Sequence, residues 1–278
     1  NFFVLHKENV RSKGYKEVIF KHYGDNYVSF KNLKKVAVYN QSTKRNLLKY
    51  NLVNKNKICV VGFPRGVYSI KNRISNNNSK IKTIIYFMIS PYAGMYRKNG
   101  KLNFKGISIR KHKQFSWEPI INSVEKILLK VAHENPNINI IFKGKTGVHK
   151  ERIIFLKKKI KSKNVFFIDG GTGHKLLKKN SLIIGLNSTA VIEAMICNLN
   201  ILIPLYKKYR SYPYNHYTHK YHPDLLANNE HDLKKLILDY LNKKNLANTQ
   251  MKYKFTIKHY FEKIHNANDK LREFIEKN

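Results

Sequence analysis

The sequence predicts an α/β protein made of two domains, each built on a parallel sheet. Short apolar runs, such as residues 83–89 and 182–186, alternate with helical segments along most of the chain. Such continuous runs are typical of parallel strands that are buried on both faces. A polar stretch without apolar periodicity, residues 66–82, separates two groups of these runs and is the predicted linker.

The first group occupies residues 1–65, which we expect to be the C-terminal part of an N-terminal domain begun elsewhere. Its predicted strands cover residues 2–5, 35–39 and 58–61, and a helix opened by Ser42 or Thr43 covers residues 41–50. Ser and Thr are favoured at a helix N-terminus because their oxygens accept hydrogen bonds from the first free backbone N–H groups.

The second group defines a domain over residues 83–230, followed by C-terminal helices over residues 231–278. Pro119 lies close to the start of a predicted helix that ends at Asn135, as proline does at first helical positions. A second helix is expected over residues 153–160, and amphipathic helices over residues 232–241 and 255–276. The expected strands are residues 83–89, 138–142, 165–168, 182–186 and 201–203.

Polar loops follow four of these strands. Because the carboxyl ends of parallel strands meet at one edge of the sheet, where ligands of such sheets bind, the loops should lie close together. They cover residues 90–94, 143–147, 169–174 and 187–189. Ser90, Lys143, Lys145 and Gly171 are candidate binding residues in the first three loops, and either lysine could neutralise a phosphate or be a solvated loop lysine.

The stretch from Ser181 to Pro204 reads as strand, polar turn, helix, turn and strand. Asn187, Ser188 and Thr189 open the helix, whose free N–H groups favour phosphate. Glu193 lies among apolar residues one turn further on and has no capping-box spacing, so it is a candidate to bind ribose hydroxyls. The alternative is a structural cap with a buried carboxylate bonded to backbone.

The same residues, which read "N-S-T-A-V-I-E-A" after a strand, resemble the donor-nucleotide motif of GT-B glycosyltransferases of bacterial surface-polysaccharide and lipopolysaccharide synthesis. The resemblance implies two Rossmann-type domains, the N-terminal one incomplete here, with donor phosphate at Ser188 and Thr189 and ribose at Glu193. It is closest to enzymes that use CMP-activated acidic sugars such as Kdo, with enzymes that use UDP-sugar donors next. The family usually has Gly where this chain has Asn198, and Asn also tolerates a positive φ.

His6-Lys7-Glu8 follows the first strand and is similar to an "H-K-E" in some polysaccharide transferases. Inverting sugar transfer needs a base for the acceptor hydroxyl, so we expect Glu8 to be the general base and His6 to position the acceptor or share the proton. The alternative is a charged surface loop after an edge strand.

The formal net charge of +37 would by itself indicate nucleic acid. However, 9 of the 54 basic residues are Arg and 54 − 9 = 45 are Lys, whereas readers of nucleic acid favour the bidentate guanidinium. We therefore expect no specific nucleic acid, and a cytoplasmic enzyme drawn peripherally to the anionic inner face of the membrane. The alternatives are a CDP-polyol phosphotransferase, a nucleotide-sugar epimerase on the same fold, or a basic RNA-binding protein.

The expected substrates are a nucleotide sugar and a glycan or glycolipid acceptor, with no cofactor and no metal. Cys59 and Cys197 belong to no metal or redox motif. The three histidines at positions 216, 219 and 222 have neither a partner Cys nor a carboxylate before Asp224, which argues against zinc.

Overall fold

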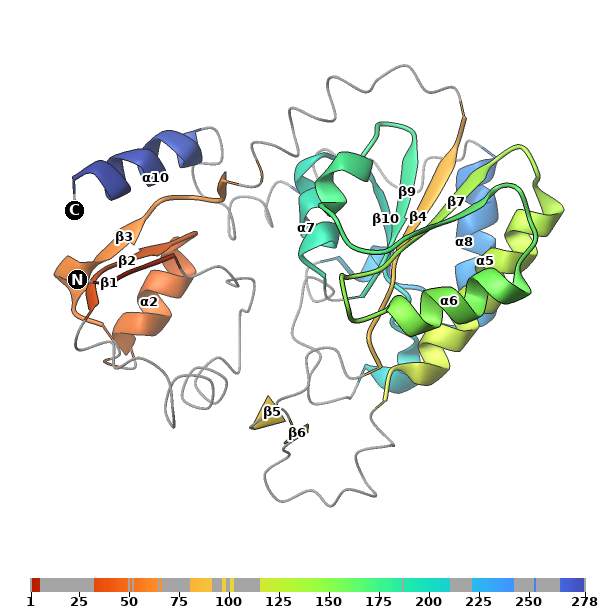
Figure 1. Ribbon diagram of the computed structural model, residues 1–278, viewed down its shortest axis with the longest axis horizontal. Helices are drawn as coiled ribbons and strands as arrows, with labels where there is room; N and C mark the ends of the chain where they lie inside the picture. The colour runs from red at the N-terminus through yellow and green to blue at the C-terminus, as the bar shows by residue number, and fades with distance from the viewer. Residues whose placement is uncertain are drawn as a thin grey trace. The chain divides into compact units, whose positions relative to one another are not determined.

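The computed structural model describes residues 2–5, 33–49, 51, 53–64, 66, 81–91, 97–98, 101–102, 116–186, 188–210, 222–242, 253 and 266–277. The chain divides into two compact units, and each has its own parallel sheet (Figure 1). Unit 1 comprises residues 1–71 and 251–278, and unit 2 comprises residues 72–250.

Unit 1 is a three-stranded parallel sheet in the order β1-β2-β3, made of Phe2–Leu5, Leu33–Val38 and Ile58–Val60. Side chains alternate between the two faces of a strand, so neighbouring residues of β2 bury against different helices. Val36 and Val38 pack with Leu47 of α2 (Gln41–Lys49), and Ala37 packs with Phe274 of α10 (Ala267–Glu276). A short 3₁₀ helix, Lys55–Lys57, precedes β3.

Unit 2 is built on a five-stranded parallel sheet in the order β10-β9-β4-β7-β8. The first strand along the chain, β4, lies at the centre, the next two lie on one side of it, and the last two lie on the other. The chain therefore changes direction between β4 and β9, which is the topological switch point of a Rossmann-like sheet. The strands are Thr83–Phe87 (β4), Asn139–Lys143 (β7), Val165–Ile168 (β8), Ser181–Ile184 (β9) and Asn200–Leu202 (β10).

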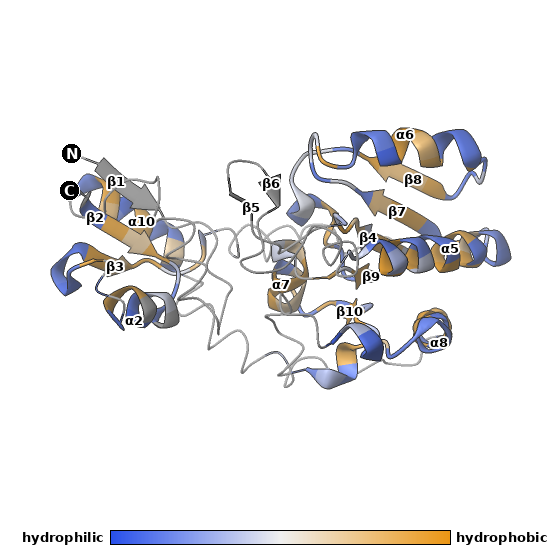
Figure 2. Ribbon diagram, turned by 90° about the horizontal axis from the view of Figure 1, so that it is seen from below, coloured by the Kyte–Doolittle hydropathy of each residue, from blue (hydrophilic) through white to orange (hydrophobic). Residues whose placement is uncertain are grey.

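In the described parts of unit 2, four helices accompany this sheet, and their burial differs. In α7 (Thr189–Ile196), residues 191–196 are all buried, and the helix is largely orange in Figure 2. In α6 (Lys150–Lys159), the buried residues are Ile153 and Leu156. The other two helices are α5 (Glu118–Glu134) and α8 (Glu230–Leu241). Short 3₁₀ helices cover Gly173–Leu176, Lys207–Tyr209 and Pro223–Leu225. Two short strands, Arg97–Lys98 (β5) and Lys101–Leu102 (β6), form a separate antiparallel pair.

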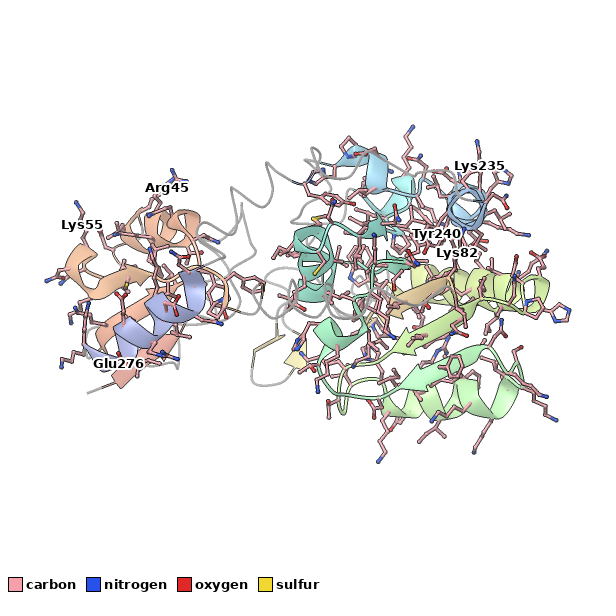
Figure 3. All side chains as sticks on the ribbon, turned by 90° about the horizontal axis from the view of Figure 1, so that it is seen from above. Arg45, Lys55, Lys82, Lys235, Tyr240 and Glu276 are labelled. Carbon is pink, nitrogen blue, oxygen red and sulfur yellow. The ribbon has the colours of Figure 1, made fainter. Side chains whose placement is uncertain are left out.

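At the amino edge of this sheet, the side chains of Lys82 and Tyr240 lie close together and bond to backbone carbonyls (Figure 3). Lys82 precedes β4, and its ammonium donates to the backbone carbonyls of Tyr240 (3.1 Å) and Leu241 at the end of α8. The Tyr240 hydroxyl donates to the carbonyl of Asn180 just before β9 (2.8 Å). A cation at a helix C-terminus satisfies its free carbonyls and opposes the negative end of the helix dipole. This cluster therefore fixes α8 to the strand starts.

The predicted strands and helices in the described parts of the chain are all present, with shifts at their ends. β9 ends at Ile184, so Gly185 and Leu186 belong to the turn that follows, and α6 begins at Lys150, three residues earlier than expected. Asn198 has φ +55°, which confirms the expected positive φ at that turn. Among the described residues, no helix is both long and apolar enough to cross a membrane.

Candidate functional site

The loops after β8 and β9 and the end of β4 are in contact at the carboxyl edge of the unit 2 sheet. A Cβ on Gly173 would lie 2.9 Å from the Phe87 ring and 3.7 Å from Cβ of Ala190. A Cβ on Gly185 would lie 3.0 Å from Val191 Cγ2. The 2.9 Å and 3.0 Å distances are both tighter than ordinary van der Waals contact, so a larger residue at either position would require the neighbouring side chain to shift. The sequence therefore builds a close-packed switch point around that helix N-terminus.

The start of α7 is fixed by its own cap. The Ser188 hydroxyl accepts the Ala190 N–H (3.2 Å), and the Ser188 carbonyl accepts the Val191 N–H (3.0 Å). Ser188 and Thr189 are partly exposed, whereas the helix behind them is buried. The predicted N-cap is therefore confirmed, and the positive end of the α7 dipole lies at the surface, where an anion can approach. Asn187 lies outside the described residues.

His149 belongs to this edge, although the sequence reasoning did not single it out. Its Nδ1 accepts the backbone N–H of Lys145 (2.9 Å), and its Nε2 lies 3.3 Å from the Ser90 hydroxyl. Because Nδ1 accepts, the neutral ring carries its proton on Nε2, which donates to Ser90. Burial lowers the pKa of His149 and so favours this neutral form. The ring ties the loop after β7 to the loop after β4, and the Ser90 O–H remains able to donate.

The two lysines of the loop after β7 differ. The Lys143 side chain is buried, and its ammonium donates to the carbonyl of Gly144 (2.6 Å). Burial lowers the pKa of Lys143, and the nearby carboxylate of Asp169 acts in the opposite direction. Lys145 is exposed, so it is the better placed of the two to meet a phosphate from solvent.

Glu193 and Gly171 lie at opposite extremes of burial. Glu193 has no exposed surface, so a ribose would have to displace what now covers this carboxylate, and its predicted role stays a prediction. Gly171 is exposed in the loop after β8 with φ +69°, a conformation that favours glycine. Its backbone is open to a ligand, and its contact with a nucleotide also stays a prediction.

His6 and Glu8 lie outside the described residues, as do two of the three histidines considered for zinc, at positions 216 and 219. Within the described ranges, no three His, Cys, Asp or Glu side chains gather to hold a metal ion. His149 and Asp169 are the site residues that sequence reasoning missed. The available signal was position: Asp169 directly follows β8, and His149 is the last residue of the loop between β7 and α6.

No protein-family model matches the chain, and no curated protein matches it either. Solved structures do match, at 12–15% identity. A putative UDP-N-acetylglucosamine 2-epimerase from Listeria monocytogenes matches with TM-score 0.51 and 14% identity over 99% of this chain and 69% of that one. The wall teichoic acid polymerase TagF matches with TM-score 0.53 and 15% identity over 97% and 63%. The S. aureus MnaA–UDP structure matches with TM-score 0.53 and 12% identity over 94% and 65%.

These likenesses and the two parallel sheets define the class: the chain has a Rossmann-like, GT-B-type fold. It spans about two thirds of the length of these structures, from 63% of TagF to 69% of the Listeria protein. The predicted fold class is confirmed.

Proposed function

We propose that the protein acts as a glycosyltransferase that takes a sugar from a nucleotide-activated donor, without a metal ion. The observation that carries the proposal is the closely packed switch point, at which the partly exposed start of α7 meets the end of β4 and the loop after β8. The donor phosphates lie at Ser188 and Thr189, with Lys145 as a counter-charge. Structures of similar fold support this, since their names refer to UDP-N-acetylglucosamine, to UDP and to wall teichoic acid.

The finer proposal is a CMP-activated acidic sugar such as Kdo as donor and a surface glycan or glycolipid as acceptor, at the inner face of the membrane. It rests on the resemblance of residues 187–194 to the donor motif of such enzymes. The +37 charge supports attraction to an anionic donor, acceptor and lipid surface.

A thermal-unfolding panel with CMP, CDP, UDP and GDP tests the donor class. A nucleotide present at 100 times its Kd stabilises the folded protein by about 2.7 kcal/mol, and we expect the largest shift with a cytidine nucleotide. A larger shift with UDP would move the donor class to UDP-sugars. No shift with any nucleotide at millimolar concentration would contradict the nucleotide site.

The role of Glu193 is tested by comparing a ribonucleotide with its 2′-deoxy form. In the wild type, we expect the deoxy form to bind about 10-fold more weakly, since one hydrogen bond to a charged group is worth about 1.5–3 kcal/mol. In Glu193→Gln that penalty should shrink. Equal penalties in both proteins would make Glu193 purely structural.

For catalysis, we propose Glu8 as the general base, with His6 positioning the acceptor. Losing a general base costs about 10²–10⁴-fold in rate with little effect on donor affinity. Glu8→Gln should therefore bind nucleotide normally and transfer sugar at least ~100-fold more slowly. Activity within a few-fold of wild type, together with complete loss in His6→Ala, would make His6 the base.

Nucleotide-sugar epimerisation is the second candidate, favoured by the likeness to the putative 2-epimerase. Incubation with UDP-N-acetylglucosamine alone separates the two functions. An epimerase forms the epimer without an acceptor, whereas the proposed transferase leaves the sugar configuration unchanged. Appearance of the epimer by NMR would replace the transferase proposal.

A further inference from the structure

A pocket of about 510 Å³ opens in unit 2 between the start of α5, the turn after β10 and the start of α8. It is lined by Pro119 and by residues 206–209 and 228–230. None of the residues assigned to the nucleotide lines it. Its volume falls within the range of about 300–1,000 Å³ that small-molecule sites occupy. The pocket is therefore large enough for a ligand of its own.

Two tyrosines, Tyr206 and Tyr209, are among the lining residues of this pocket. The centroids of Tyr206 and Tyr209 lie 6.5 Å apart with the rings tilted by 36°, and both residues are buried. The Tyr206 hydroxyl bonds to the hydroxyl of Ser123 on α5 (2.6 Å), which holds the ring in place. Burial raises the pKa of Tyr206 to about 12, so the ring is neutral. The negative faces of such rings suit the polarised C–H face of a sugar ring.

Hydrogen bonds connect the two segments of the chain, residues 206–210 and 228–232, that contain most of the pocket lining. The backbone N–H of Lys207 donates to the carbonyl of Asn228 (2.9 Å), and the Arg210 guanidinium donates to the Asn228 side chain (2.6 Å). Asp232 in turn accepts from both the backbone and side-chain N–H groups of Asn228 (2.8 Å each). Because these bonds do not involve a ligand, the pocket is formed before one arrives, which lowers the entropic cost of binding.

The charged residues of the pocket lining are all exposed. Lys207 and Lys208 are exposed, as is Glu230, so the formal charge of the lining is +2 − 1 = +1. The Lys208 ammonium lies over the Tyr209 ring, 4.8 Å from its centroid, so an anion that pairs with this ammonium would be held next to that ring. The Glu230 carboxylate can accept a hydrogen bond from a sugar hydroxyl. Helices α5 and α8 both begin at this pocket, and their dipoles add positive potential.

We propose that this pocket binds an acidic sugar unit, a pyranose that carries a carboxylate or a phosphate, at a site separate from the nucleotide. The ring packs on Tyr209, the acidic group pairs with Lys207 and Lys208, and a hydroxyl donates to Glu230. The inference is drawn from the pocket alone and does not depend on the proposed transferase activity.

Saturation-transfer NMR with three matched sugars tests the proposal: glucose, glucuronate and glucose 6-phosphate. They share one ring and differ in the group at carbon 6, so the first measures ring binding and the other two separate carboxylate from phosphate. We expect saturation of the ring protons for at least one acidic sugar, at least ~5-fold stronger than for glucose. No transfer to either acidic sugar, or equal transfer to all three, would overturn the proposal.

Paired variants locate the binding. Lys207→Ala with Lys208→Ala should remove the preference for the acidic sugar, and Tyr209→Leu should remove ring saturation if its thermal unfolding shows that it folds. Lys126→Ala with Lys235→Ala removes the same charge from exposed positions of α5 and α8 outside the pocket lining and should change nothing. Equal loss in both lysine pairs would show attraction to the general +37 charge only and would overturn the pocket.

Competition separates this result from the nucleotide proposal. A nucleotide that stabilises the protein should leave the sugar signal in place, whereas displacement of the sugar would contradict a separate pocket. If no nucleotide binds and the acidic sugar does, the proposed transferase fails and the pocket stands.

Discussion

The two edges of the unit 2 sheet use similar residues for different purposes. At the amino edge, Lys82 and Tyr240 bond to backbone carbonyls of α8 and of the residue before β9, so the protein supplies its own partners. At the carboxyl edge, Lys145 is exposed, and Ser188 and Thr189 at the positive end of α7 are partly exposed. Lys82 is therefore structural at the end of α8, whereas Lys145, in the loop before α6, is available to a ligand.

The largest expected effect is a loss of stability when the amino edge is changed, without a loss of nucleotide binding at the carboxyl edge. Lys82→Met should lower the free energy of unfolding by about 2–3 kcal/mol, because it leaves two helix-end carbonyls without their charged donor. Nucleotide affinity should stay within twofold, as the amino edge takes no part in binding. Denaturant unfolding of Lys82→Met beside Lys178→Met, an exposed lysine, checks this. Equal stability of the two variants would show that the Lys82 bonds contribute nothing.

A second, smaller effect at the carboxyl edge depends on pH through His149. Its pKa is lower in the folded state than in the unfolded chain, where it is about 6.5. The unfolded state therefore takes up the proton first, and stability is lost as the pH falls below about 6.5, by at most about 1.4 kcal/mol per pH unit. In His149→Gln, which keeps an acceptor and a donor, unfolding between pH 7.5 and 5 should lose less stability. Identical pH profiles would contradict a buried neutral ring.

The smallest expected effect concerns the two lysines after β7. Lys145→Ala should weaken nucleotide binding about fivefold, or about 1 kcal/mol, as expected for an exposed ion pair. Lys178→Ala is the control for charge alone and should change the affinity less than twofold. If both variants weaken binding equally, Lys145 acts through the net charge of the protein and not through contact.

The strand positions in unit 2 could be predicted from the sequence. Strands such as β7 and β9 are covered on both faces, so they need continuous runs of apolar residues. The order of the strands could not be predicted, because it depends on crossover connections. These pair Thr83 of β4 with Ser181 of β9, which lie almost a hundred residues apart in sequence. The Ser188 cap was predictable from local hydrogen bonding, and the structure confirms it. His149 was not, because its role arises from contacts with Ser90, 59 residues away in sequence.

The burial of Lys143 could not be predicted from the sequence either. Its sequence position, one residue before Gly144 at a strand end, is compatible with a solvent-facing ammonium. In the structure, that ammonium instead donates to the Gly144 carbonyl, and Asp169 of the loop after β8 lies close by. Local sequence thus predicts which loop carries charge, and tertiary packing decides which lysine presents it.

The measurement that tests the central claim most directly is the calorimetric affinity of Ser188→Ala with Thr189→Ala for the nucleotide that stabilises the wild type. If the start of α7 holds the donor phosphates, the Kd should rise at least ~10-fold, a loss of about 1.4 kcal/mol, while the fold remains intact. Lys82→Met, at the opposite edge, should bind like the wild type. An unchanged Kd in the double variant would contradict the assignment of the carboxyl edge as the donor site.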